Sequence, residues 1–265
     1  MSDKISIITV CYNAQDCIED TIKSVLCQSY HNYQYIIIDG ASSDNTMECV
    51  EKYKINFSQH GIEYIVCSEL DDGIFDAMNK GACMADGDWI IYMNAGDGFV
   101  DQDVLKNIIN QPLDGYDVVY GDVILRDGCY YRKRLANPLE NLLFEMPFYH
   151  QCTMTKRSRL LETPFDTQYN YTSDYNFFLH LYLNDGQYLY INQYIAVYEQ
   201  YGVSDTFDSQ KEFVNIQYKN GVIKTIGIKT KLHLFYMKYL LFIREKIRKC
   251  FPNIYFSKYR GWYVK

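Results

Sequence analysis

DGDWIIYMNAGDG, residues 86–98, is the stretch that decides the fold class of this chain. It contains a short apolar run, residues 89–93, with glycine and aspartate on both sides. Such a run predicts a buried strand that ends in a polar loop. In an open α/β sheet, ligands bind beyond the carboxyl ends of the strands, so we expect Asp97 to lie at the edge of a ligand site.

Three further strand and helix pairs precede this stretch. The apolar or β-branched runs 4–10, 35–40 and 62–67 predict strands, and each is followed by apolar residues at helical spacing. Four strands that alternate with three helices predict a parallel, doubly wound α/β sheet. The glycine fingerprint of dinucleotide-binding proteins is missing after the first strand, which disfavours a dehydrogenase.

The pattern is less regular after Asp97. We expect a helix at 104–109, a strand at 117–125 with a hairpin turn at 126–129, a strand at 150–154 and a helix from residue 172. From about residue 208 the chain is expected to be helical, with a break at 221–227. The sequence thus predicts one domain over residues 1–207 and a basic, aromatic helical extension over 208–265.

Bulk composition indicates a globular protein in a reducing compartment. Of the 265 residues, 48% are hydrophobic and 22% charged, which is ordinary for a folded domain. The nine cysteines are scattered without a Cys-x-x-Cys pair, which favours reduced thiols over disulfides. The five histidines form no zinc-type grouping with them. The first strand is too short and too polar-flanked for a signal peptide, so we expect a cytoplasmic protein.

Charge is concentrated at the end of the chain. Residues 211–265 hold 13 Lys or Arg against two acids, a net charge of +11. Residues 1–210 have a net charge of −18, so the whole chain has a net charge of −7. The apolar run 232–243 is interrupted by Lys238 and is too short to span a bilayer. It predicts an amphipathic helix on the inner face of the cytoplasmic membrane, where anionic lipids attract basic residues. The alternative is a helix that covers the core or forms a homodimer; nucleic-acid binding is disfavoured because no recognised motif accompanies the charge.

Three acids stand at the ends of predicted strands or the starts of helices: Asp39, Asp97 and Asp174. Each also has a structural explanation, as a turn residue in the first two cases and as a helix N-cap in the third. Their order along the chain and the segments around them favour a functional role.

These segments resemble a known family. ITVCYNAQDCIEDTIKSVLCQSYHNYQYIIIDGASSDNT, residues 8–46, is similar to the opening of the inverting glycosyltransferases of family 2, which have the GT-A fold. SELDDGIFDAMNKGACMADGDWIIYMNAGDGF, residues 68–99, resembles their next block, especially in the branch that makes bacterial surface polysaccharides. The resemblance covers roughly residues 4–205. It implies a Rossmann-like, mostly parallel sheet with a nucleotide-binding half over 1–100 and an acceptor half over 101–207.

The resemblance also implies roles for residues of the first half. Asp39 would accept a hydrogen bond from the base edge, which for uracil is the N3 proton. Asp71 would contact the ribose or a phosphate, and it is preferred over its neighbour Asp72 for this role. Lys80 would neutralise a phosphate, although an exposed helix lysine is the alternative. The remaining residues implied for nucleotide binding are Thr9, Tyr12 and Asn13 around the base and ribose, and Ala95 and Gly96 in the loop after the central strand.

Asp97 matches the last acid of the family's DxD-type metal motif. A Mg²⁺ or Mn²⁺ ion would bridge the two phosphates and stabilise the departing diphosphate. This chain has Asn94 and Gly96 where many members have acids, so Asp97 is the only carboxylate of the motif.

Residues of the second half complete the implied site. Asp174 matches the general base that takes the acceptor proton, although Ser173 precedes it where the family usually has Glu. His150 and Gln151 would touch the diphosphate or the acceptor, or else pack. Ser204, in a Gly-x-Ser segment, would close over the phosphates, or else belong to a simple turn.

The sequence therefore leads to one main hypothesis and two alternatives. The main one is an inverting glycosyltransferase that moves a sugar from a nucleotide-sugar donor, UDP-sugar first, to a hydroxyl of a growing, lipid-linked glycan. The first alternative is a catalytically inactive nucleotide-sugar-binding scaffold. The second is an interaction protein of the membrane surface that acts through its basic tail.

Overall fold

A computed structural model describes residues 3–199, 206–250 and 262–264 of the chain. The first half alternates strands and helices as expected, apart from an extra short helix before the third strand. Its elements are β1 (Ile5–Cys11), α1 (Ile18–Leu26), β2 (Tyr33–Asp39), α2 (Thr46–Glu51), α3 (Lys54–Gln59), β3 (Glu63–Ser68), α4 (Ile74–Met84) and β4 (Trp89–Tyr92).

The second half mixes strands, short helices and long connections. Its elements are β5 (Gly98–Phe99), α5 (Val104–Ile109), β6 (Val118–Asp127), β7 (Tyr130–Arg134), the 3₁₀ helices η1 (Leu139–Leu143) and η2 (His150–Cys152), β8 (Thr153–Lys156), α6 (Arg157–Glu162), α7 (Ser173–Leu183), β9 (Tyr188–Glu199), α8 (Phe207–Lys219), α9 (Ile228–Cys250) and β10 (Trp262–Val264). The strand expected at 150–154 is wrong at its start, because residues 150–152 form a 3₁₀ turn and pairing begins at Thr153.

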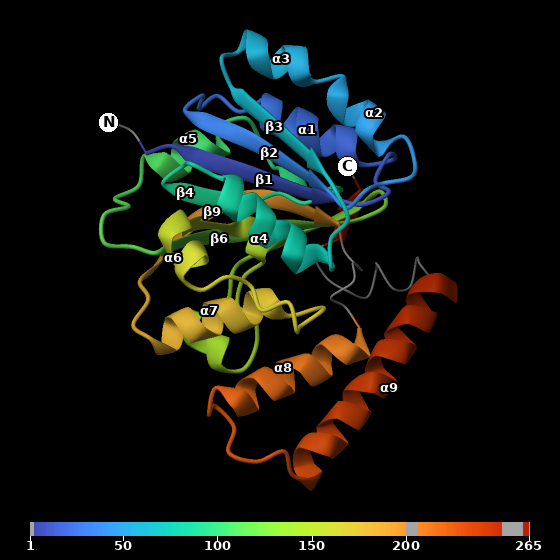
Figure 1. Cartoon of the computed structure of the whole chain (residues 1–265). Coiled ribbons are helices and arrows are strands. Elements are labelled where there is room, and N and C mark those ends of the chain that lie inside the picture. Colours follow the sequence, from blue (N-terminus) through green and yellow to red (C-terminus); the bar gives the residue numbers. More distant parts are fainter. Residues whose placement is uncertain (1–2, 200–205, 251–261, 265) are drawn as a thin grey trace.

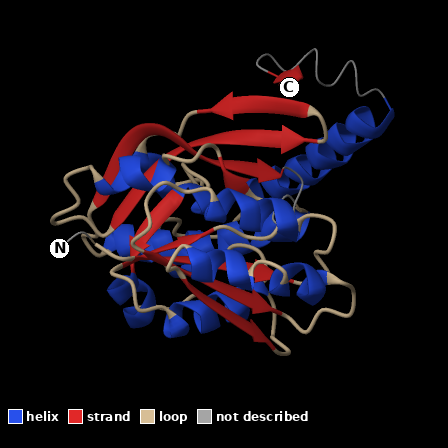
Figure 2. Ribbon diagram, turned by 90° about the horizontal axis from the view of Figure 1, so that it is seen from above, coloured by secondary structure: helices blue, strands red, loops and turns tan. Residues whose placement is uncertain are grey.

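One sheet with the order β10-β7-β6-β8-β4-β1-β2-β3 runs through the molecule, and β9 joins it beside β6 (Figures 1 and 2). Strands β4, β1, β2 and β3 are mutually parallel, which confirms the expected doubly wound half. β8 pairs antiparallel with β4, and β6 antiparallel with β8, so the second half extends the sheet with reversed strands. The extension is not wholly helical, because β10 pairs with the edge strand β7.

Two apolar cores lie on the two faces of this sheet. Successive side chains of a strand point to opposite faces, so Ile5 and Ile7 of β1 pack with α1 and α5 on one face. Ile8 and Val10 belong to the core on the other face, which includes α4, α6 and α7. Figure 1 shows α1 to α3 above the sheet and α4, α6 and α7 below it. Because both faces are covered, β1 and β2 are buried along their whole length.

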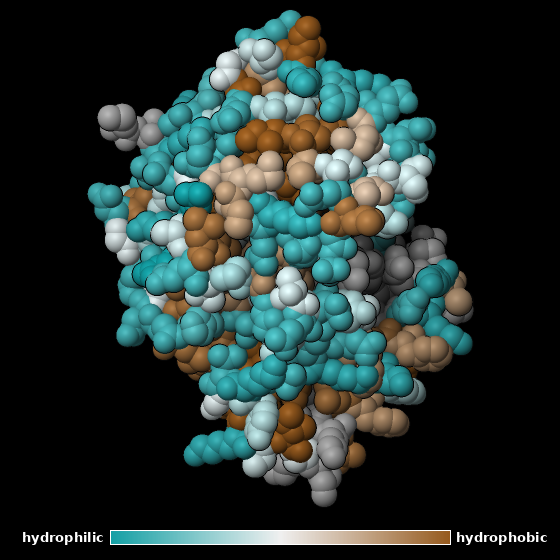
Figure 3. Space-filling view, viewed as in Figure 1, coloured by the Kyte–Doolittle hydropathy of each residue, from teal (hydrophilic) through white to brown (hydrophobic). Residues whose placement is uncertain are grey.

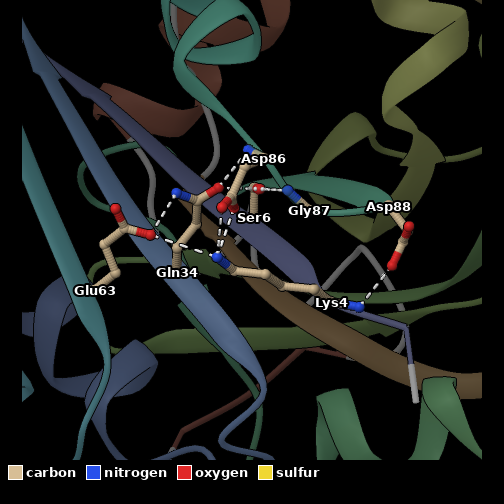
Figure 4. A network of polar contacts seen from close by, with 7 residues as sticks. All are labelled: Lys4, Ser6, Gln34, Glu63, Asp86, Gly87 and Asp88. Atoms are coloured by element: carbon tan, nitrogen blue, oxygen red, sulfur yellow. Dashed lines mark hydrogen bonds and ion pairs between the residues drawn. The ribbon is translucent and has the colours of Figure 1, made fainter. Parts of the chain in front are cut away.

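A polar network fixes the register of the strands at the end opposite their carboxyl termini (Figure 4). The ammonium group of Lys4 lies 2.6 Å from a carboxylate oxygen of Asp86, and the Ser6 hydroxyl donates to the Gln34 side chain at 2.7 Å. Gly87 donates its N–H to Ser6 Oγ at 2.9 Å. A Cβ at Gly87 would approach the backbone nitrogen of Ser6 to 2.7 Å, so the chain can pass this point only as glycine.

Helices α8 and α9 follow the domain in sequence and extend from its lower side in Figure 1. α8 packs against α7, where the rings of Tyr175 and Phe213 lie 4.3 Å apart between centroids. α9 packs against α8. None of the helices in the described ranges is long and apolar enough to cross a membrane.

Candidate functional site

The parallel pairing gathers the carboxyl ends of four strands at one edge of the sheet. Cys11 of β1 is the register partner of Asp39 in β2, and Asp39 is the partner of Ser68 in β3. β4 ends beside them, because Ile8 of β1 pairs with Tyr92. The loops that follow these strands therefore meet at the edge where open α/β sheets bind ligands.

Asp39 is completely buried at this edge. Its carboxylate accepts hydrogen bonds from the Ser42 N–H at 3.0 Å, from the Ser42 hydroxyl at 2.5 Å and from the Ser68 hydroxyl at 2.6 Å. These bonds satisfy the buried carboxylate and tie the loop after β2 to β3. Because the Asp39 side chain is fully buried, contact with a base edge would need the residues that cover it to move.

Tyr12, Gly40 and Asp71 come together from three separate loops. A Cβ at Gly40 would lie 2.7 Å from a carboxylate oxygen of Asp71 and 3.4 Å from the ring of Tyr12. Tyr12 is 66% exposed, so its ring offers an open apolar face beside this carboxylate. Asn13 follows with φ of 47° and accepts a hydrogen bond from Ser43 N, which fixes the turn. Three residues expected around the nucleoside are thus neighbours, and Gly40 is the residue that lets them approach.

Two residues expected to touch the nucleotide have other partners in the structure. Thr9 is fully buried, and its hydroxyl contacts Tyr35 Oη at 2.8 Å and donates to Met93 O at 2.7 Å. It therefore faces the core and not an open pocket, because its position in β1 points it inward. Lys80 pairs with Glu69 at 3.0 Å and with Asp76 at 3.2 Å, so its charge is already used to hold the loop before α4.

The loop after β4 carries Asp97 in a buried position. Asp97 is 7% exposed, and its Oδ2 accepts from Gln151 Nε2 at 2.9 Å while its Oδ1 accepts from the N–H of Glu199 at 3.1 Å. Gly96 has φ of 97°, a left-handed conformation that favours glycine. Desolvation by burial raises the pKa of Asp97 to about 7, although the Glu199 N–H and the positive charges nearby oppose the rise.

Arg126 is a site residue that the sequence did not single out. It lies on β6 opposite Glu199 of β9, and its Nε is 2.5 Å from a Glu199 carboxylate oxygen. Its Nη2 donates to the carbonyl of Gly96 at 2.9 Å, so a guanidinium lies against the loop that contains Asp97. Sequence analysis assigned Arg126 to a hairpin turn, and only the pairing of β6 with β9 brings it to the loop.

His150 connects the loop after β4 to the start of α7. Its Nδ1 lies 3.2 Å from Asp174 Oδ2, and its Nε2 lies 3.3 Å from Asn94 Nδ2. Asp174 is the second residue of α7, and its Oδ1 accepts from the N–H of Tyr175 at 2.8 Å. A carboxylate in the first helical turn is stabilised by the helix dipole. The structure therefore brings Asn94, His150 and Asp174 together with Gln151 and Asp97.

Glu212 of α8 holds the segment that leads into α7. Its carboxylate accepts from the N–H groups of Asn170, Tyr171 and Thr172, and from the Thr172 hydroxyl, at distances of 2.9 to 3.1 Å. A single carboxylate thus fixes the backbone two residues before Asp174. The basic extension predicted from residue 208 therefore begins with a helix that supports the site.

The side chains near Asp97 supply only some of the ligands that a metal ion needs. Within residues 3–199 and 206–250, no group of three or more His, Cys, Asp or Glu side chains is arranged to hold a metal ion. Asp97 supplies one buried carboxylate, and Asn94 Oδ1 is a buried oxygen without a hydrogen-bond partner. These hard oxygens fit Mg²⁺ or Mn²⁺ in a site completed by phosphates and water, which is how Mg²⁺ is usually bound in such sites. Ser204, expected to close over the phosphates, lies outside the described residues.

The arrangement has two chemical ends along one edge of the sheet. Tyr12 and Asp71 offer an aromatic face and a hydrogen-bond acceptor, which suit a nucleoside. Asp174 offers a fixed carboxylate for proton removal, and Arg126 offers positive charge near Asp97. The loop 94–98 contacts the second of these two groups, through Asn94 to His150 and through Gly96 to Arg126.

Comparison with known families and relatives agrees with this geometry. The family model described as "Glycosyl transferase family 2" matches residues 6–172. A PGL/p-HBAD biosynthesis glycosyltransferase of Mycobacterium bovis is 28% identical over 217 residues, which cover 79% of this chain and 82% of that protein. A putative teichuronic acid biosynthesis glycosyltransferase of Bacillus subtilis, TuaG, is 37% identical over 94 residues, which cover 35% of this chain and 36% of the relative.

Solved structures share the fold at low sequence identity. A fragment of TarS from S. aureus, solved in complex with UDP, superposes with a TM-score of 0.63 at 17% identity; the match covers 80% of this chain and 65% of that one. The mannosyltransferase PcManGT from Pyrobaculum calidifontis, solved with GDP-Man and Mn²⁺, gives a TM-score of 0.63 at 16% identity, covering 91% and 70%. The expected GT-A fold, a mostly parallel sheet flanked by helices, is confirmed.

The raised pKa of Asp97 predicts a pH window for stability. In the unfolded chain this carboxyl ionises near its ordinary pKa of 3.8, whereas in the folded protein it ionises only near 7. The folded state thus holds the extra proton, and stability falls as pH rises from about 4 to 7. In metal-free buffer, Asp97→Asn removes this loss, and we expect it to be more stable than the wild type at pH 8 by up to about 4 kcal/mol, which corresponds to a shift of about three pKa units.

Urea unfolding of both proteins from pH 4 to pH 8 measures this difference. The stability gap should grow between about pH 4 and 7 and stay constant above it. A gap that does not change with pH would show that Asp97 titrates normally in the folded protein.

The hydrogen bonds of Glu212 to residues 170–172 predict that changes in α8 affect the site. Glu212→Gln keeps the size of the side chain but turns a donor toward N–H groups, so bonds to a charged acceptor, worth about 1.5 to 3 kcal/mol each, are weakened. We expect a melting temperature lower by several degrees and, because Asp174 loses its fixed position, a turnover lower by about tenfold. The control is Asp208→Asn on the same helix, whose carboxylate forms an exposed ion pair with Lys211. Equal effects of the two variants would contradict the coupling.

Proposed function

Because the chain belongs to glycosyltransferase family 2, it is a transferase enzyme, and we propose that it moves one sugar from a nucleotide-sugar donor to a hydroxyl of a glycan with inversion at the anomeric carbon. The observation that carries this proposal is the position of Asp174. It is a partly buried carboxylate with both oxygens hydrogen-bonded, at the same sheet edge as Tyr12 and Asp71. A fixed base at the sheet edge where the nucleotide would bind is what direct displacement requires.

In the proposed reaction the acceptor oxygen attacks the anomeric carbon on the face opposite the leaving group. Asp174 takes the hydroxyl proton as the new carbon–oxygen bond forms. The bond between the anomeric carbon and the phosphate oxygen breaks, and the nucleoside diphosphate leaves with the electron pair. One base suffices for this displacement, and no covalent intermediate is needed.

Negative charge develops on the diphosphate as it leaves. The guanidinium of Arg126 donates a hydrogen bond to the carbonyl of Gly96, so it places a positive charge next to the loop that contains Asp97. Asp97 and Asn94 would hold a Mg²⁺ or Mn²⁺ ion, which would add Lewis-acid stabilisation of the phosphates. Because the protein offers so few ligands, affinity for the ion should depend on the nucleotide.

UDP-sugar is the donor that we propose first. The open ring of Tyr12 and the carboxylate of Asp71, which meet at Gly40, suit a pyrimidine nucleoside. TarS was solved with UDP and PcManGT with GDP-Man, so a guanine nucleotide is the second candidate. The relatives named for PGL/p-HBAD and teichuronic acid biosynthesis support a cell-surface glycan as the class of acceptor.

A lipid-linked acceptor agrees with the surface of α9. Its exposed aromatic residues Phe235, Tyr239 and Phe242 follow one another at intervals of three or four residues, so they share a face. Lys238, Lys246 and Lys249 are also exposed on this helix, whose only acid is Glu245. In Figure 3, apolar side chains interrupt the hydrophilic surface at the lower end of the molecule, over α8 and α9. A basic helix with exposed aromatics suits the interface of an anionic bilayer, which is where a lipid-linked acceptor would be presented.

An inactive scaffold that binds nucleotide sugars is the second candidate. The observations that favour it are the single carboxylate of the metal motif and the absence, within the described residues, of a complete metal-binding group. Such a scaffold would bind the donor but have no use for a hydrogen-bonded Asp174.

Nucleotide binding and turnover test the proposal together. Melting temperatures are measured with UDP, GDP, CMP and dTDP, each with Mn²⁺, Mg²⁺ or chelator, because a ligand at 100 times its Kd adds about 2.7 kcal/mol. We expect a metal-dependent shift that is largest with UDP. Asp174→Asn should keep this shift and lower sugar transfer or donor hydrolysis by at least about 100-fold.

Two results would go against this function. If no nucleotide shifts the melting temperature, the donor site is wrong. If the nucleotide binds but wild type and Asp174→Asn are equally inactive with every donor, the scaffold is favoured.

Vesicle sedimentation tests the membrane surface. We expect the full chain to bind vesicles of phosphatidylglycerol and phosphatidylcholine, and to lose most binding in phosphatidylcholine alone or at high salt. The double variant Phe235→Ser with Phe242→Ser should reduce vesicle binding about tenfold or more, because it removes two aromatic side chains that would insert into the bilayer interface. The matched control is Tyr218→Ser on α8. Unchanged vesicle binding, together with a loss of dimers on gel filtration, would instead assign this face to a second copy of the chain.

A further inference from the structure

A polar pocket lies between α5 and the first half of β9. Its volume is about 510 Å³, which is within the range of about 300 to 1,000 Å³ that is usual for small-molecule sites. α5 and the turn after it contribute three carboxamide side chains, and β9 contributes two more and one tyrosine. The side chains concerned are Asn107, Asn110, Gln111, Tyr190, Asn192 and Gln193.

β9 connects this pocket to the loop that contains Asp97. The N–H of Glu199, at the end of the strand, donates to Asp97 Oδ1, whereas Gln193 stands six residues earlier. At about 3.3 Å per residue, the pocket lies roughly 20 Å from Asp97 along the strand. A ligand in the pocket is therefore too far from the site to be the sugar that reacts.

A bulge in β9 forms one wall of the pocket. The register of β9 against β6 shifts between Tyr190 and Tyr194, so that three residues of β9 stand opposite the single residue Gly121. A Cβ at Gly121 would lie 2.6 Å from the carbonyl oxygen of Gln193, so a larger residue would push the bulge away. Bulges redirect side chains and are common next to binding and active sites.

Tyr190 presents an aromatic ring at the pocket. Its hydroxyl donates to Oδ1 of the buried Asp122 at 3.1 Å, and its ring lies 5.5 Å from the ring of Tyr120 between centroids. The residue is nevertheless 42% exposed. These contacts fix the ring and leave part of it open, and an apolar ring of this kind can cover the C–H face of a sugar.

The amide groups of the pocket are available to a ligand. Asn107, Asn110 and Asn192 are exposed, and within the described ranges their side chains form no hydrogen bond. Nε2 of Gln193 is buried without a partner, although buried donors are nearly always hydrogen-bonded. A carboxamide offers both a donor and an acceptor, as each hydroxyl group of a sugar does.

The residues that line the pocket are all uncharged. A phosphate or a uronate would lose water here without gaining an opposite charge, which is costly. An apolar ligand would leave the carboxamides that it covers without partners, which is also unfavourable. The lining therefore fits a neutral ligand with many hydroxyl groups.

We propose that this pocket binds a neutral hexopyranose residue of the glycan acceptor, at a distance from the sugar that receives the transfer. This role rests on the transferase function proposed above. A glycan that is held here has a higher effective concentration of its acceptor end at the site. The pocket thus lowers KM for long acceptors and leaves the chemical step unchanged.

Sugar binding can be measured without any assay of transfer. Saturation-transfer NMR is recorded on the full chain in chelator and without nucleotide. The probes are the tetrasaccharides of glucose, galactose, mannose and N-acetylglucosamine, with tetragalacturonate as the charged probe. We expect at least one neutral probe to bind, tetragalacturonate to bind more weakly, and neutral binding to persist when UDP and Mn²⁺ are added. No binding by any neutral probe, or tighter binding of tetragalacturonate, would overturn the proposal.

Two single variants locate the bound sugar. Asn110→Ala and Gln193→Ala each remove one carboxamide, and we expect each to raise the Kd of the bound tetrasaccharide about tenfold, because hydrogen bonds to the sugar are lost. The control is Gln59→Ala, which removes a carboxamide at an exposed position of α3 and should leave the Kd unchanged. Equal Kd values in all four proteins, with melting temperatures that show them folded, would place the sugar elsewhere and reject the pocket.

Kinetics separate this proposal from the transferase function. With an acceptor identified, Asn110→Ala should raise KM for a tetrasaccharide acceptor about tenfold, and should leave kcat, donor KM and KM for a monosaccharide acceptor within about twofold. An equal change of KM for short and long acceptors would contradict a distant subsite.

The two proposals can fail independently. If the wild type transfers no sugar but the two pocket variants weaken tetrasaccharide binding, the transferase function fails and the pocket remains a sugar-binding site. If the wild type transfers sugar but binds none of the neutral tetrasaccharides, only the pocket proposal fails.

Discussion

The parallel pairing of β1 with both β2 and β4 is the constraint on which the rest of this structure depends. It aligns Cys11 with Asp39 and sets Tyr92 beside Ile8, so that three loops leave the sheet at one edge. The opposite edge is closed by the network of Lys4, Ser6 and Asp86, which leaves little freedom for the strands to slip (Figure 4). A slip of one residue would turn every buried side chain to the wrong face.

The site is assembled by side chains that hold one another across these loops. Gln151 holds Asp97, His150 holds Asp174, and Glu212 holds the segment before α7. Most of these contacts bind a carboxylate that burial would otherwise make costly. Burial raises the pKa of Asp97 to about 7 in spite of its two hydrogen bonds, so its ionised form is costly at this position. A cation that binds together with a diphosphate would offset that cost.

The two helices at the end of the chain, α8 and α9, face in different directions. α8 faces inward, because Glu212 and Phe213 contact the start of α7. α9 packs on α8 and keeps Phe235 and Tyr239 exposed. An event at the exposed face of α9 therefore lies only one helix away from the segment that positions Asp174. α8 therefore connects α9 to the segment that precedes Asp174.

The sequence by itself determined the alternation of strands and helices, and with it the edge at which Asp39 and Asp97 lie, because hydrophobic periodicity and the turn residues that end each element are local properties. It also indicated the family, since the motifs around those acids are contiguous. Only the tertiary structure decided which side chains meet: Thr9 faces the core, Lys80 pairs with its own loop, and Arg126 and Glu212 reach the site from β6 and α8. These contacts depend on strand register and helix packing between residues far apart in the chain, which no local pattern encodes.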